Sequence, residues 1–232
     1  MKSFFFLTLL CASLHAQAKD SVKIPDRYPS CGDELTENNQ IQLSLKKAEF
    51  LIPSNCIPTR EVDLSKLKPD RSLEELDFKQ LCEQDPCNDF IIMHPENISS
   101  FDSLRAFSAD ALSRASAVRV FKQMKKLKNV KALRITRTLI GDFPIDVLEL
   151  RSLEELVLDD VNSIPKEIVQ LGRLKRLLVV SSTLRTLPEE LKQFKKLELG
   201  LLSDQFPENT RKALKLKFPK VQFTFIDPND SL

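Results

Sequence analysis

The sequence of 232 residues is poor in the residues that most enzyme motifs require. It contains only four glycines and two histidines. It has no glycine-rich phosphate loop, no nucleophile elbow and no paired-histidine metal motif. His15 lies near the start of the chain, and His94 stands alone beside Pro95. The neighbouring carboxylates Asp159 and Asp160 point apart on a strand or a helix. We therefore expect no catalytic residue, no metal and no cofactor.

Long apolar runs are also missing after the first eighteen residues, where no segment approaches the ~20 apolar residues that span a bilayer. Residues 1–18 have the pattern of a signal peptide, with Lys2 before an apolar run from Phe4 to Leu14 and Ala16-Gln17-Ala18 as a cleavage site. We expect an exported protein that is secreted, periplasmic or attached to the cell surface. Lipid attachment at Cys11 is the alternative, although the bulky Leu10 before it disfavours such a site.

Cysteine is confined to the first half of the chain. Without the leader, four cysteines remain: Cys31, Cys56, Cys82 and Cys87. An even number in an exported chain predicts two disulfides with three possible pairings. We favour Cys31–Cys56 with Cys82–Cys87, because the second pair closes a short loop. A zinc site built from four thiolates is the alternative, but its cysteines usually form two close pairs, and Cys31 and Cys56 are 25 residues apart.

Residues 127–194 contain three copies of one pattern, which start at Leu127, Leu150 and Leu171 at intervals of 23 and 21 residues. The copies align apolar residues in columns: Val130, Leu153 and Leu174; Leu133, Leu156 and Leu177; Ile135, Leu158 and Val179; Val147, Ile168 and Leu191. A period of this length predicts a solenoid of stacked supersecondary units.

Each copy predicts one strand followed by one short helical turn. Apolar residues alternate in the first half, which indicates a strand with one buried face. The second half has helical spacing after Pro144, Pro165 or Pro188, and proline suits a first helical position. Because one such unit cannot bury its leucines alone, neighbouring copies must stack as parallel strands.

These columns resemble the leucine-rich repeat family in its LxxLxL…LPxxIxxL form, and the chain is similar to small exported bacterial members. The resemblance implies an α/β horseshoe with parallel strands on the concave face, short helices on the convex face and a disulfide-stapled N-terminal cap. It also implies protein–protein recognition. One feature departs from the family pattern: the Asn expected after each strand is replaced by Thr138, Val161 and Ser182.

The remaining segments extend this organisation on both sides. We expect a signal peptide at 1–18, a cap region at 19–69, irregular repeats with insertions at 70–126, regular repeats at 127–203 and a C-terminal repeat or cap at 204–232. Within them the pattern predicts strands at Leu73–Phe78, Leu104–Ala109, Lys196–Leu202 and Val221–Phe225. It also predicts helices at Ala109–Lys126 and Arg211–Phe218.

The residues between the buried columns are expected to line the concave face. They include apolar side chains surrounded by charged ones, a combination that marks protein-binding surfaces. The candidate partner-binding residues are Arg134, Arg137, Val157, Asp159, Asp160, Arg176, Leu178 and Val180. The alternative stays open, because parallel strands favour aliphatic residues on either face. The expected partner is another protein, on a cell surface or in a host, and homo-oligomers are also possible.

Charge is uneven along the chain, with acidic residues in excess over residues 30–100 and basic residues in excess from residue 101 onward. The densest basic run is Lys122, Lys125, Lys126, Lys128, Lys131, Arg134 and Arg137. It supports a second hypothesis, a surface protein that binds polyanions or glycans with its basic C-terminal part. A solvated convex helix face is the favoured interpretation of the run. We expect no nucleic-acid partner, because no aromatic residues interleave to stack on bases.

Overall fold

A computed structural model of the chain describes residues 47–53, 61–66, 73–81, 91–181 and 183–227. The signal peptide predicted at residues 1–18 lies outside these ranges. So do all five cysteines, Cys11, Cys31, Cys56, Cys82 and Cys87. The leader, the disulfides and the lipid alternative therefore stay predictions.

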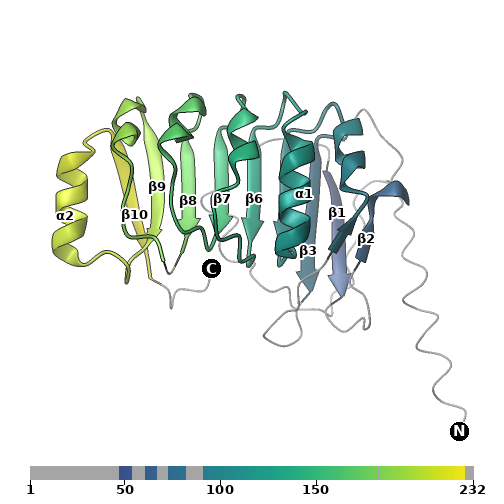
Figure 1. The fold of residues 1–232 in the computed structure, drawn as a ribbon, viewed down its shortest axis with the longest axis horizontal. Helices are drawn as coiled ribbons and strands as arrows, with labels where there is room; N and C mark the ends of the chain where they lie inside the picture. Colours follow the sequence, from purple (N-terminus) through teal and green to yellow (C-terminus); the bar gives the residue numbers. More distant parts are fainter. Residues whose placement is uncertain (1–46, 54–60, 67–72, 82–90, 182, 228–232) are drawn as a thin grey trace, which may run out of the picture.

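Eight parallel strands form one sheet, in which they follow one another in sequence order. They are β1 (Lys47–Pro53), β3 (Glu75–Leu81), β5 (Ala106–Asp110), β6 (Ala132–Thr136), β7 (Glu155–Asp159), β8 (Arg176–Val180), β9 (Leu197–Leu202) and β10 (Val221–Ile226). Figure 1 shows these strands side by side along the molecule, with α1 and the short helical segments on one side of the sheet. The prediction of stacked units, each with a parallel strand, is confirmed.

The helical layer contains two α-helices and several 3-10 segments. They are η2 (Leu64–Lys66), η3 (Pro95–Ser100), α1 (Arg114–Met124), η4 (Ile145–Glu149), η5 (Lys166–Gln170), η6 (Glu189–Gln193) and α2 (Glu208–Lys217). A separate two-stranded parallel sheet pairs β2 (Glu61–Asp63) with β4 (Ile91–Met93). The backbone N–H of Ile92 donates to Ser116 Oγ over 3.0 Å, which joins this small sheet to α1.

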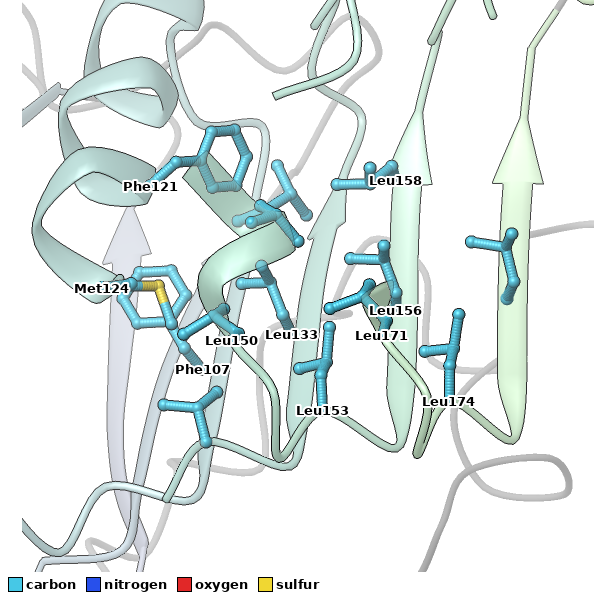
Figure 2. Packing of buried hydrophobic residues seen from close by; sticks show 14 of the residues in the cluster. Phe107, Phe121, Met124, Leu133, Leu150, Leu153, Leu156, Leu158, Leu171 and Leu174 are labelled. Carbon is cyan, nitrogen blue, oxygen red and sulfur yellow. The ribbon is translucent and has the colours of Figure 1, made fainter. Parts of the chain in front are cut away.

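The core lies between the large sheet and the helical layer. The strand register places Leu133 beside Leu156 and Leu156 beside Leu177, as the repeat columns predict. All three side chains are fully buried. Figure 2 shows Leu153, Leu156 and other leucines projecting from the strands and loops into this core. Complete burial of a leucine stabilises the fold by about 2 kcal/mol, so the stacked columns supply most of the driving force.

A 3-10 turn follows each of the repeat prolines Pro144, Pro165 and Pro188. In each of the three regular copies the segment begins directly after the proline, and the proline carbonyl accepts a hydrogen bond from the N–H three residues later. The donors are Val147, Ile168 and Leu191, over distances of 2.9, 3.1 and 3.2 Å. All three donor residues are buried. A five-residue turn of this type is long enough to place one apolar side chain over the core.

Several elements differ from the sequence expectation. The sheet of β2 and β4 was not predicted, and α2 begins at Glu208 instead of Arg211. The strand β1 extends the sheet beyond β3, although Lys47–Pro53 lacks the LxxLxL pattern. The helix predicted at Ala109–Lys126 is shorter, because β5 continues to Asp110 and α1 begins only at Arg114. Ser113 caps it, since its side chain accepts from the N–H of Ser116.

Candidate binding face

The sheet face opposite the helical layer, here called the helix-free face, corresponds to the predicted concave face. Alternation along the strands sends every second side chain to it. The register aligns two columns across neighbouring strands: Glu75, Ala106, Ala132, Glu155, Arg176 and Glu198; and Asp77, Ser108, Arg134, Val157, Leu178, Gly200 and Thr224. Residues of both columns therefore lie side by side on this face.

An ion-pair network lies at the centre of the helix-free face. The Arg134 Nε atom donates to Glu155 Oε1, and Arg176 Nη1 lies 3.5 Å from Glu155 Oε2. Glu155 is 0% exposed and Arg134 only 9%. A carboxylate at such a depth requires charged partners, and these two guanidinium groups supply them. Arg134 was predicted to contact a partner, but the structure buries it within the protein.

A second ion pair lies where the strands end. Arg137 Nε donates to Asp110 Oδ1 over 2.6 Å, and its Nη2 donates to Asp110 Oδ2. The hydroxyl of Thr136 also donates to Asp110 Oδ1, over 3.0 Å. Because this bidentate pair links one repeat to the next, Arg137 stabilises the stack in addition to any role in binding.

Three successive strands end in a left-handed residue. Ala111, Arg137 and Asp160 follow β5, β6 and β7 directly, with φ values of 56°, 49° and 47°. Different side chains satisfy the backbone at successive corners in place of the missing Asn. The Asp159 carboxylate accepts backbone N–H groups of Arg137 and Asp160. At the next corner, Ser181 Oγ accepts the N–H of Leu184 over 3.3 Å.

Asp159 carries a perturbed carboxyl group. Burial raises the pKa of Asp159 to about 6, from an ordinary value of 3.8. The negative charges of Asp160 and Asp110 act in the same direction, and the two backbone hydrogen bonds only partly oppose them. The sequence pointed to Asp159 as a binding residue, but its geometry shows a capping role as well.

The apolar residues of the helix-free face lie over the last three strands. Leu178 and Val180 are half-buried, whereas Val157 is only 8% exposed, so the expectation that Val157 is an exposed residue is wrong. A β-carbon at Gly200 would lie 2.5 Å from Leu178 Cδ1, which shows that Leu178 lies across this glycine. We call the half-buried Leu178, Val180 and Ile226, together with Leu202, which is only 9% exposed, the apolar patch.

Sequence reasoning missed Leu202 and Ile226 in this patch. Alternation along β9 buries Leu197, Leu199 and Leu201, so Leu202 falls on the opposite face together with Gly200. The register then places Ile226 beside Leu202. The alternation of β9 and β10 was visible in the sequence and would have identified both residues.

The densest basic run does not form one surface. Lys122, Lys125 and Lys126 are exposed on or beside α1, whereas Arg134 and Arg137 belong to the other side of the sheet. Lys125 Nζ lies 2.7 Å from Asp146 Oδ1, and this hydrogen bond raises the pKa of Lys125. The run is therefore divided between the helical layer and the other face of the sheet.

The described residues offer little to support chemistry. His94 is exposed, and its Nδ1 lies 3.0 Å from Glu96 Oε1. No group of three or more His, Cys, Asp or Glu side chains in the described part of the chain is placed to hold a metal ion. Within the same ranges, no helix is both long and apolar enough to cross a membrane.

Comparison with known proteins yields fold similarity only. No protein-family model and no curated protein matches the sequence. One similar solved structure is a leucine-rich repeat protein of Leptospira interrogans, with 20% identity and a TM-score of 0.41. Another is an internalin of Listeria monocytogenes, with 18% identity and a TM-score of 0.36. The matches cover 67% and 70% of this chain but 55% and 46% of those proteins, so the chain spans about half the length of each.

Proposed function

We propose that the chain is a non-catalytic repeat module that binds another protein through the helix-free face. The binding surface is the apolar patch together with the polar residues beside it, Arg176, Glu198 and Thr224. The observation that carries this proposal is the row of half-buried aliphatic side chains on β8 and β10, opposite the helical layer. Apolar residues with a charged rim are typical of protein interfaces.

The proposal uses fewer of the residues that the sequence predicted to contact the partner. Leu178, Val180 and Arg176 keep this role in it. Arg134 and Val157 do not contact the partner in the proposal, because both are buried. They support the residues around them. The polyanion hypothesis rests on the excess of basic residues from residue 101 onward, and the densest basic run contributes less to it because that run is divided between two faces.

Photo-crosslinking tests the proposed surface. Thr224 is exposed on the helix-free face, and Lys212 is exposed on α2. A photoreactive amino acid placed at Thr224 should capture a defined partner, and the same group at Lys212 should capture it weakly or not at all. Equal capture from both positions would count against binding through the helix-free face.

Export is a further part of the proposal. It rests on the signal-peptide pattern of residues 1–18 and on the even number of cysteines that remain without them. N-terminal sequencing of the protein recovered from outside the cytoplasm should begin at Lys19. Recovery of a chain that still begins at Met1, inside the cytoplasm, would refute export.

A further inference from the structure

The C-terminal end of the solenoid has a concentration of lysines that the proposed function does not use. Figure 1 shows α2 beyond β10 at this end of the molecule. Four exposed lysines here have no ion-pair partner among the described residues: Lys195, Lys196, Lys215 and Lys220. Lys196 and Lys220 directly precede the paired residues Leu197 and Val221, so they lie side by side just before the neighbouring strands β9 and β10.

Cations at the start of earlier strands contact carboxylates. Arg105 pairs with Glu74 over 3.4 Å and Lys131 pairs with Glu154 over 3.3 Å. Lys175 also contacts Glu154. Just before β9 and β10, Lys196 and Lys220 lie side by side, and neither has an ion-pair partner among the described residues. The positive charge of these two lysines is therefore not balanced by a neighbouring carboxylate.

Aromatic rings hold several of the cations in place. Arg211 and Lys215 lie over the ring of Phe225, at 5.2 and 5.9 Å from its centre. Lys192 and Lys217 lie over Phe218, at 5.8 and 5.4 Å. Cation–π contacts of this kind reduce the freedom of the long side chains. Of the four unpaired lysines, Lys215 is held in this way.

An exposed leucine lies among these lysines. Leu216 is 84% exposed, the largest exposed fraction among the large apolar side chains described as exposed. Helical periodicity places it on the face of α2 opposite Leu214, which packs against the core. Lys212 and Lys217 flank it on the same helix. A lone leucine surrounded by lysines is poorly suited to a soluble polyanion, which offers it no apolar contact.

We propose that this end of the molecule, formed by α2 and the loops before β9 and β10, docks on an anionic lipid bilayer. The lysines contact the lipid phosphates, and Leu216 enters the boundary between headgroups and acyl chains. Basic residues around exposed leucine have this function in interfacial helices. A second copy of the chain fits less well, because it would bring the same lysines together.

Vesicle binding by the chain from Lys19 onward tests the proposal. The probes are vesicles of phosphatidylcholine alone and of phosphatidylcholine mixed with phosphatidylglycerol. The variant Lys196→Gln/Lys215→Gln/Lys220→Gln removes three unpaired charges at the C-terminal end. Its control, Lys122→Gln/Lys126→Gln/Lys128→Gln, removes three exposed charges in and after α1. All variants begin at Lys19, as the proposed exported protein does, so the apolar run of residues 4–14 does not contribute to lipid binding.

We expect the C-terminal variant to bind the anionic vesicles roughly a hundredfold more weakly, at about fivefold per lysine. The control should lose little affinity, and neutral vesicles should not distinguish the variants. Equal losses in both triple variants would overturn the proposal, as would binding that does not depend on anionic lipid. Circular dichroism checks that each variant is folded.

Insertion of the leucine has its own measurement. The sequence contains no tryptophan, so Leu216→Trp introduces a single fluorophore. Its emission should shift to the blue on addition of anionic vesicles, while that of the control Val118→Trp on α1 should not. Emission that stays unchanged at position 216 would overturn insertion. Heparin binding equal to vesicle binding, and unaffected by Leu216→Ser, would assign the lysines to a soluble polyanion instead.

Discussion

At the scale of single residues, Glu155 is the most constrained position of the helix-free face. Its carboxylate is fully buried and contacts the guanidinium groups of Arg134 and Arg176. Removing one partner of a buried ion pair is more costly than the net contribution of the pair, since the other charge stays buried. The network therefore fixes the register of β6, β7 and β8.

Glu155→Ala should lower the free energy of unfolding by about 3–5 kcal/mol, because two cations are left without a buried partner. Chemical denaturation measures this loss. Glu208→Ala is the matched control, since its carboxylate is exposed and lies 3.5 Å from Lys212 Nζ. The control should change stability by less than about 1 kcal/mol. Equal losses at the two positions would show that Glu155 contributes no more than a surface ion pair.

Asp159 makes stability depend on pH. Burial raises the pKa of Asp159 to about 6 in the folded protein, so between its ordinary pKa and that value the folded state binds more protons than the unfolded state. The contribution of Asp159 to stability is therefore present below pH about 4 and is lost as the pH rises through 6.

Asp159→Asn should remove this dependence, because an amide does not titrate and its oxygen still accepts the corner N–H groups. Relative to wild type, the variant should gain on the order of 1–2 kcal/mol between pH 4 and pH 8. Unfolding of both proteins by denaturant at the two pH values gives the difference. A difference that is the same at both values would contradict the assignment.

At the scale of elements, β9 shapes the apolar patch through Gly200. A side chain at this position would meet the end of Leu178, and the leucine is flexible enough to move aside. Gly200→Ala should therefore change stability little, by less than about 1 kcal/mol, but it should displace Leu178 and weaken partner binding. Adding Leu178→Ala should remove the effect of the first substitution on binding. Wild-type affinity in Gly200→Ala would separate the patch from the interface.

A hydrogen bond to the buried Ser116 hydroxyl joins the helix α1 to the small sheet of β2 and β4. Ser116 is fully buried and accepts the N–H of Ile92. Ser116→Ala should cost about 1–3 kcal/mol, the usual penalty for an unsatisfied buried donor, and should speed hydrogen exchange at the Ile92 amide. Ser113→Ala removes only the helix cap and should leave that amide protected. Unchanged exchange in Ser116→Ala would contradict this contact.

The elements differ in how well their sequences predict them. Strands such as β7 are specified by local spacing, since Leu156 and Leu158 occupy alternate positions and recur one repeat later as Leu177 and Val179. The strand β1 lacks this recurrence, and its place beside β3 depends on tertiary pairing. Likewise, alternation put Val157 on the correct face, but its burial depends on long neighbouring side chains that spacing does not describe.

At the scale of the whole molecule, the two faces of the sheet and its C-terminal end have different properties. One face packs under the helical layer and forms the core, and the opposite face combines a buried ion network with the apolar patch. The end that carries α2 has unpaired lysines around Leu216. We propose that a protein binds the helix-free face and that an anionic bilayer contacts the end of the molecule that carries α2.

The affinity of a Leu178→Glu/Val180→Glu variant for the crosslinked partner tests the central claim most directly. The matched control, Val118→Glu/Ile145→Glu, adds two charges at exposed apolar positions on α1 and η4. With both variants folded, the first should bind at least about a hundredfold more weakly, since each buried charge without a partner opposes binding strongly. The control should bind as wild type does. Full affinity in the first variant, or an equal loss in the control, would contradict binding through the helix-free face.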